Sequence, residues 1–271
     1  MRSNLPYLSR TWVIVLLFGL FACSTVPVTG RKSLNILPDS ELLSMSLQQY
    51  NDVLKKSKLS NDPVKAQMVK RVGERIARAT EQFFRENGME SEITNYKWEF
   101  NLIEEDKTVN AWCMPGGKVA VYTGILPLTQ DDTGLAVVMG HEIAHAIAKH
   151  GNERMSHGLL AQLGAVGLSA ALSSNPSATG QIFMAAYGLG ANVGILLPYS
   201  RLQESEADRI GLVLMAKAGY DPRQAVPFWQ RMNKSGGERP PEFLSTHPAP
   251  ETRIQRIESE IPEAMRYYKG N

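Results

Sequence analysis

The chain has 271 residues, with 29 lysines and arginines against 27 aspartates and glutamates, and 43% of its residues are hydrophobic. This composition is that of an ordinary globular protein with room for one substantial domain. The nearly balanced charge excludes the strongly basic class of nucleic-acid-binding proteins, so we expect no nucleic-acid partner.

The N-terminus resembles the signal of a bacterial lipoprotein. Arg2 and Arg10 precede an apolar stretch over residues 12–22, which is too short to span a bilayer but has the length of a signal-peptide core. The stretch runs into Leu-Phe-Ala-Cys, which makes Cys23 the predicted lipidation site. Ser24, in place of an aspartate, resembles the pattern for sorting to the outer membrane. An uncleaved signal anchor is the alternative.

These features predict three segments along the chain. A signal peptide covers residues 1–22, a lipidated tether covers 23–33, and one folded domain covers 34–271. If Cys23 carries lipid, Cys113 has no partner for an internal disulfide. A redox or metal role for Cys113 is an alternative to the simpler interpretation as a small buried side chain.

Two helices are predicted at the start of the domain. The first covers about 39–56, and the second begins at Asp62-Pro63, a capping residue followed by proline, and ends near Gly88. The helical spacing of apolar residues in the second helix predicts that it turns five side chains toward a core: Val64, Met68, Val72, Ile76 and Phe83.

A small sheet is predicted next. Apolar and polar residues alternate over 96–102, as in a half-buried strand. Residues 109–113 and 118–122 flank Pro115-Gly116-Gly117, which predicts a hairpin.

Residues 141–145 read His-Glu-Ile-Ala-His, an H-E-x-x-H pentapeptide inside an apolar helical run. We predict a helix from about Asp132, after a capping box that begins at Thr129, to His150, with Gly151 as the residue that ends it. Two histidines four apart lie on one helix face and can hold a zinc ion, while the glutamate beside the first can accept a proton from water. A surface helix that matches by accident is the alternative.

Gly140 lowers helix propensity directly before this motif, which predicts close approach by another segment, for example substrate backbone. The stretch from 158 to 198 is apolar and rich in glycine and alanine, but it is too interrupted for a membrane span. We predict a helical hairpin over the active-site helix, either as a movable lid or as a static core pair.

A third metal ligand is predicted downstream, because catalytic zinc usually has three protein ligands. Glu204 and Asp208 lie one turn apart on a helix that runs to a stop at Gly219. Glu204 can reach the metal while Asp208 orients a ligand histidine. Glu206 is predicted to lie on the surface. A solvated, charged helix start is the alternative interpretation.

Two further helices are predicted toward the C-terminus, over about 221–233 and after Pro250. A loop rich in glycine and proline over 235–241 separates them and precedes His247. The last helix includes Arg253.

These motifs together resemble the gluzincin metallopeptidase family of HtpX, BepA and the CAAX prenyl proteases, over roughly residues 34–261. Within it, the chain is most similar to the short outer-membrane lipoproteins, because no long repeat-containing tail follows the domain. The residues that carry the resemblance are Asn110-Ala111, Pro115-Gly116-Gly117, the H-E-x-x-H helix, Leu197-Pro198-Tyr199-Ser200-Arg201, Glu204 with Asp208, and Thr246-His247-Pro248.

The resemblance implies a role for each matching residue. His141, His145 and Glu204 are expected to bind one Zn²⁺ per chain, with Glu142 as the general base and Asp208 as the carboxylate behind a ligand histidine. His247 and Arg253 match residues near the metal that would stabilise the oxyanion. His247 has two alternatives, a fourth zinc ligand that keeps the enzyme latent and an ordinary loop histidine.

The resemblance also implies a fold and a substrate site. We expect an α+β, mainly helical, zincin-like metallopeptidase domain with a small mixed β-sheet beside the H-E-x-x-H helix. Asn110 and Ala111 would begin an edge strand that pairs with an extended substrate, unless the hairpin is purely structural.

The predicted function is therefore a zinc-dependent metalloendopeptidase that degrades misfolded or misassembled envelope proteins. It would be lipid-anchored at Cys23 on the periplasmic side of a bacterial outer membrane, with possible contact to the outer-membrane assembly machinery. Two alternatives are a metal-bound chaperone or assembly factor with little proteolysis, and a zinc hydrolase with a non-protein substrate.

Overall fold

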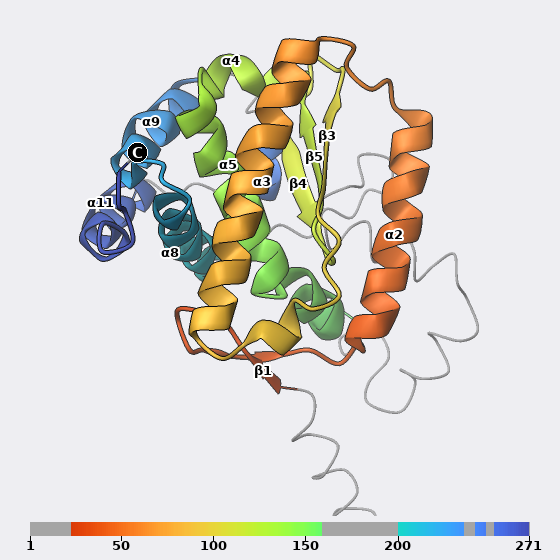
Figure 1. Ribbon diagram of the computed structural model, residues 1–271, viewed down its shortest axis with the longest axis vertical. Helices are drawn as coiled ribbons and strands as arrows, with labels where there is room; N and C mark the ends of the chain where they lie inside the picture. Colours follow the sequence, from red (N-terminus) through yellow and green to blue (C-terminus); the bar gives the residue numbers. More distant parts are fainter. Residues whose placement is uncertain (1–22, 159–199, 236–241, 248–251, 271) are drawn as a thin grey trace, which may run out of the picture.

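The structure is a computed structural model that describes residues 23–158, 200–235, 242–247 and 252–270. Figure 1 shows a mainly helical molecule with a small mixed sheet, as predicted. Residues 1–22, predicted to be a signal peptide, and nearly all of the apolar stretch from 158 to 198, predicted to be a helical hairpin, lie outside the described residues. No helix among the described residues is long and apolar enough to cross a membrane.

The longer named helices among the described residues carry the labels of Figure 1. They are α2 (Asp39–Lys56), α3 (Pro63–Glu86), α5 (Asp132–Ile147), α8 (Arg201–Lys217), α9 (Ala225–Lys234) and α11 (Arg253–Ala264). The shorter helices are α4 (Leu126–Thr129) and α10 (Glu242–Thr246), with single 3-10 turns at Glu90–Glu92, Thr123–Ile125 and Pro222–Gln224. Residues 150–158 are also helical.

Among the residues that the structure describes, the sheet has three strands in the order β3 (Glu99–Ile103), β5 (Lys118–Tyr122) and β4 (Ala111–Met114). β3 runs parallel to β5, whereas β4 and β5 form the predicted antiparallel hairpin. Gly116 and Gly117 in its turn have φ angles of 80° and 78°, a region that favours glycine. β4 therefore lies at an edge of the sheet.

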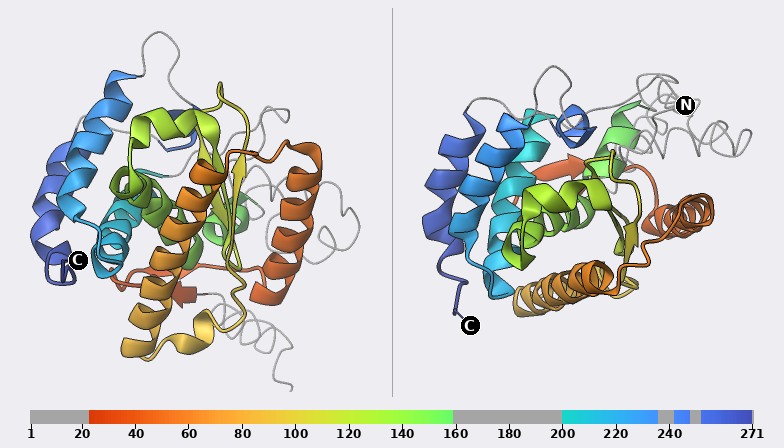
Figure 2. Two further views of the ribbon diagram at one scale, coloured as in Figure 1. Left: turned by 45° about the horizontal axis from the view of Figure 1, so that its top comes forward. Right: turned by 90° about the horizontal axis from the view of Figure 1, so that it is seen from above.

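Both faces of the sheet are covered. Figure 2 shows the sheet between α2 on one side and α3 with α5 on the other, and α8, α9 and α11 lie beyond α5. Under α2, the hydroxyl of Tyr50 donates a hydrogen bond of 3.0 Å to the carbonyl of Val119. The main hydrophobic core joins the opposite face of the sheet to α3, α5 and α8. α5 is thus the central element, in contact with the sheet and with the second helix bundle.

The helix α3 begins and ends where the sequence predicts, but its first turn is not part of the core. Asp62 caps it by accepting hydrogen bonds from the backbone amides of Val64 and Lys65. Val72, Ile76 and Phe83 are buried as expected, whereas Val64 is 77% exposed. The prediction for Val64 was wrong because the buried face begins one turn later, at Met68 and Val69.

The ends of α5 differ from the prediction. Asp131 is the N-cap and accepts from the amide of Gly134, so the capping box at Thr129 does not form. The helix ends at Ile147, and Lys149, not Gly151, takes the left-handed conformation, with φ of 58°. The chain then turns into the helical segment 150–158. This turn places His150 beside α5 instead of at its end.

The segment predicted as a tether, residues 23–33, belongs to the fold. β1 (Cys23–Thr25) and β2 (Lys32–Leu34) form an antiparallel pair. Val26, in the connection, is buried in the main core. Thr29 and Arg31 reach Glu206 on α8. The N-terminal hairpin is therefore attached to the same helix as the predicted metal ligand Glu204.

Candidate metal centre

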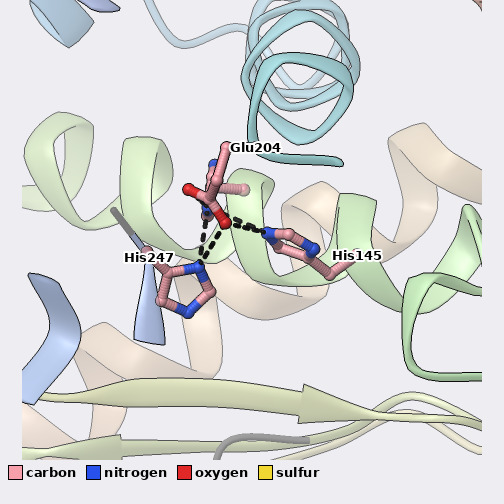
Figure 3. A group of neighbouring side chains, drawn as sticks. His145, Glu204 and His247 are labelled. Carbon is pink, nitrogen blue, oxygen red and sulfur yellow. Dashed lines mark hydrogen bonds and ion pairs between the residues drawn. The ribbon is translucent and has the colours of Figure 1, made fainter. Parts of the chain in front are cut away.

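Three parts of the chain bring four side chains with metal-binding atoms together. His141 and His145 come from α5, Glu204 from α8, and His247 directly follows α10. One ligand atom from each lies within 4.8 Å of all the others, and all four residues are buried. Figure 3 shows the Glu204 carboxylate pointing at the rings of His145 and His247.

The spacing of these atoms fits a zinc ion. Nε2 of His141 and Nε2 of His145 are 3.0 Å apart, and the Glu204 carboxylate oxygens lie 3.5 and 3.3 Å from them. Four ligands about 2.0–2.1 Å from a tetrahedral ion would lie about 3.3 Å from one another. Oε2 of Glu204 is buried and makes no hydrogen bond among the described residues, although Nη1 of Arg253 lies 3.2 Å away, and a bound ion would give this oxygen a direct ligand contact. Two imidazoles and a carboxylate are also a donor set typical of catalytic zinc.

α5 and α8 can hold their ligands close together because glycines meet where they cross. A Cβ at Gly140 would lie 3.0 Å from the carbonyl oxygen of Gly211, and a Cβ at Gly211 would lie 2.9 Å from the amide nitrogen of His141. The close approach expected at Gly140 is therefore by α8. The suggestion that substrate backbone approaches Gly140 was wrong, because Gly211 occupies that space.

A buried carboxylate and arginine support His141 from behind. Nδ1 of His141 lies 3.0 Å from Asp208 Oδ1. Arg253 donates two hydrogen bonds to Asp208, of 2.8 and 2.7 Å, and stacks over the ring of Trp229. Burial lowers the pKa of His141, but the hydrogen bonds to Asp208 and Glu204 outweigh it and raise the pKa to about 9. Asp208 lies where the sequence analysis expects it.

The guanidinium of Arg253 is buried against carboxylates. Its Nη1 is 3.2 Å from Glu204 Oε2, and the side chain is fully buried. These contacts balance the negative charge of Glu204 and Asp208. Direct contact with a reaction intermediate, as implied by the family resemblance, stays a prediction.

Glu142 lies beside the metal group without being one of its four members. Its Oε1 is 3.4 Å from Nε2 of His247 and has no hydrogen-bond partner among the described residues. Burial raises the pKa of Glu142, partly offset by the charges of His247 and His141. A carboxylate with a raised pKa is suited to accept a proton and release it again.

His247 occupies the fourth position of the group. Its Nδ1 is 3.0 Å from Glu204 Oε1 and 3.3 Å from His141 Nε2. The ring stacks on Phe243, with centroids 4.5 Å apart. The two specific roles predicted for His247 are a fourth zinc ligand and stabilisation of the oxyanion. Both are compatible with this position, since Nδ1 faces the metal group and Nε2 faces Glu142.

The predicted substrate strand borders the centre. Asn110 precedes and Ala111 begins the edge strand β4, which packs against α5. The amide of Phe243 in α10 donates a hydrogen bond of 3.1 Å to the carbonyl of Val109. The start of β4 is therefore tied to the helix that presents His247.

The sequence analysis missed a second buried polar group beside the centre. Glu206, predicted to lie on the surface, is only 4% exposed. It contacts His150, Arg31 and Thr29, and these hydrogen bonds outweigh the effect of burial and lower its pKa to about 2. The surface prediction was wrong because the N-terminal hairpin covers this side of α8. The sequence feature that could have revealed this polar group was a further histidine, His150, only five residues after His145.

Comparison with known proteins gives one family and several relatives. Residues 63–261 match the model of peptidase family M48. The chain is 40% identical over 177 residues to the mitochondrial metalloendopeptidase OMA1 of Schizosaccharomyces pombe, covering 65% of this chain and 50% of that protein. It is 31% identical over 271 residues to OMA1 of Bos taurus, covering 96% and 50%. The β-barrel assembly-enhancing protease of Escherichia coli is 26% identical over 239 residues, covering 86% and 46%.

These relatives overturn one prediction and identify the family. The matches of higher identity carry mitochondrial names, so the predicted location on a bacterial outer membrane was wrong. The signal peptide and the lipid on Cys23 are not supported by these matches and stay predictions. The chain spans about half the length of these curated relatives. Because the family model matches most of the chain and the described residues include its metal-binding group, the protein belongs to peptidase family M48, a family of zinc-dependent metallopeptidases.

Proposed function

We propose that this protein is a zinc-dependent endopeptidase that cleaves extended segments of misfolded or misassembled proteins. The observation that carries the proposal is the convergence of His141, His145 and Glu204, with Glu142 adjacent and its Oε1 without a hydrogen bond from any described residue. The family match and the names of the relatives support the same reaction class.

The chemistry follows from the positions of the side chains. A bound zinc ion would lower the pKa of water from about 15.7 to about 7 and polarise the peptide carbonyl. Glu142 accepts the proton as the water oxygen bonds to the carbonyl carbon, and it later delivers that proton to the amine that leaves. Asp208 holds the ring of His141 through Nδ1, which leaves Nε2, on the side of His145, available to hold the ion.

The edge strand β4 supports the proposed substrate class. Within the described part of the chain it pairs with β5 on one side only, and its N-terminal end lies beside α10 and α5. An extended peptide that pairs with such an edge is held mainly by backbone hydrogen bonds, which tolerate many sequences. This favours unfolded segments over one specific folded substrate.

Removing the metal tests the proposal. We expect the purified chain to cleave unfolded casein, to lose all cleavage after dialysis against a chelator, and to recover it when one equivalent of zinc is returned. Peptide fragments are followed by mass spectrometry, which also separates internal cleavage from trimming of ends. Casein that stays intact with zinc-loaded protein at one ion per chain would contradict the proposed activity.

His247→Ala is expected to raise casein cleavage severalfold while weakening zinc binding. The reason is that His247 fills the fourth position of the metal group, which water needs in a catalytic site. Cleavage rates and zinc affinity are measured on the same samples. Loss of cleavage with unchanged zinc affinity would contradict this gating role and would support stabilisation of the oxyanion instead.

A further inference from the structure

The zinc ligand His145 has a second buried contact on the side away from the metal group. Its Nε2 faces His141 and Glu204, while its Nδ1 lies 2.9 Å from Nδ1 of His150. A ring nitrogen that binds a metal must offer a lone pair, so Nδ1 of His145 carries the hydrogen. Nδ1 of His145 therefore donates to Nδ1 of His150, which accepts.

His150 is then fixed in one tautomer as well. Since its Nδ1 accepts, its hydrogen must be on Nε2, which lies 3.3 Å from Oε2 of Glu206. His150 is completely buried. The left-handed turn at Lys149 places this ring beside His145, because a continued α5 would carry it away from the ligand.

Glu206 is held by the N-terminal hairpin. Thr29 Oγ1 donates to Oε1 of Glu206 at 2.8 Å, and Arg31 Nε donates to Oε2 at 2.8 Å. The same guanidinium donates to both oxygens of Glu153, at 2.6 and 2.8 Å. Arg31 therefore bridges two buried carboxylates, and its position is set by both.

The two ligand histidines of α5 thus have matching support. His141 is backed by Asp208 and Arg253, and His145 is backed by His150, Glu206 and Arg31. In each case an arginine on a distant segment neutralises the last carboxylate. Partners behind a metal-binding histidine commonly change metal affinity by about 10- to 100-fold when they are removed.

We propose that His150, Glu206 and Arg31 are positioning residues that fix the tautomer and ring orientation of His145. The inference rests on the zinc site of the proposed function. It also implies that the N-terminal hairpin, residues 23–34, helps to position a metal ligand. This segment lies before the region matched by the family model, residues 63–261. A change that pulls the hairpin away from α8 would weaken zinc binding.

The test compares two replacements of His150. Glutamine can accept from His145 with its oxygen and donate to Glu206 with its amide, whereas leucine has similar bulk and does neither. Zinc affinity is measured by competition with a chromophoric chelator, and unfolding of the zinc-free chains is measured in urea. We expect His150→Leu to lower zinc affinity about 10- to 100-fold and His150→Gln to lie closer to the unchanged protein.

The hydrogen-bonded chain from His145 through His150 and Glu206 to Arg31 is called the relay below, and Arg31→Met tests its far end against a matched control. Arg209, on α8, makes a partly exposed ion pair with Glu263 through two hydrogen bonds, and no side-chain hydrogen bond or ion pair among the described residues joins it to the relay. We expect Arg31→Met to weaken zinc binding and Arg209→Met to leave it unchanged. If leucine and glutamine at position 150 gave equal zinc affinity, or if Arg31→Met matched its control, the relay would be excluded. Casein cleavage is scored separately, so a chain that binds zinc but does not cleave contradicts only the proposed function.

Discussion

Glu142→Gln is expected to abolish measurable casein cleavage while the protein keeps its zinc. Glu142 is not one of the four side chains of the metal group, so the amide leaves the ligands in place. The amide has no basic oxygen that could take a proton from water, and general-base catalysis typically contributes about 10²–10⁴-fold to a rate. Zinc content by atomic absorption and cleavage rates on the same samples provide the measurement.

This variant also separates the proposed peptidase from a metal-bound assembly factor. A peptidase loses its activity in Glu142→Gln but still binds casein along β4. An assembly factor would suppress aggregation of an unfolded protein equally well with glutamate or glutamine at this position. Equal cleavage by the two proteins at equal zinc content would rule out Glu142 as the general base.

Arg253→Ala is expected to destabilise the fold by about 3–5 kcal/mol, because it leaves buried carboxylates without their cation. Arg253 is 1% exposed, donates two hydrogen bonds to Asp208 and lies 3.2 Å from Glu204. The free energy of unfolding from urea titration of the zinc-free chain measures the loss. Asp208 would no longer be held against His141, so zinc affinity is expected to fall as well.

Arg209→Ala is the control for this effect. Its ion pair with Glu263 has the same two-bonded form, but the two side chains are 37% and 32% exposed. Exposed pairs contribute about 0–1 kcal/mol, so little change is expected. A similar loss of unfolding free energy in both variants would show that the buried carboxylates do not cause the effect. An unchanged free energy of unfolding in Arg253→Ala, together with reduced cleavage, would argue that Arg253 acts on the substrate instead.

Local pattern was enough to predict the parts of the site that lie on one helix. The spacing of His141 and His145 follows from helix geometry alone, and so does the pairing of Glu204 with Asp208 one turn later. The hairpin around Gly116 and Gly117 was also predictable, because its turn requires residues that tolerate positive φ angles. The outline of a mainly helical domain with a small sheet followed from these periodicities.

Other features depend on contacts between distant segments, which no local pattern contains. The glycine at position 140 is needed because Gly211, 71 positions later in the chain, packs against it where α5 and α8 cross. Glu206 looks like a surface residue until the N-terminal hairpin covers it with Arg31. Val64 shows the reverse case, an apolar residue at helical spacing whose side chain stays 77% exposed.

The sequence by itself therefore predicted the chemistry: two histidines and a glutamate for a zinc ion, and a second glutamate to move a proton. Only the tertiary structure decided which contacts hold these side chains in position. His247 reaches the site from the residue after α10, Arg253 reaches it from the start of α11, and His150 reaches it through the turn at Lys149. The physical reason is that helix periodicity places ligands on a shared face, whereas the orientation of a buried ring depends on hydrogen bonds across the whole fold.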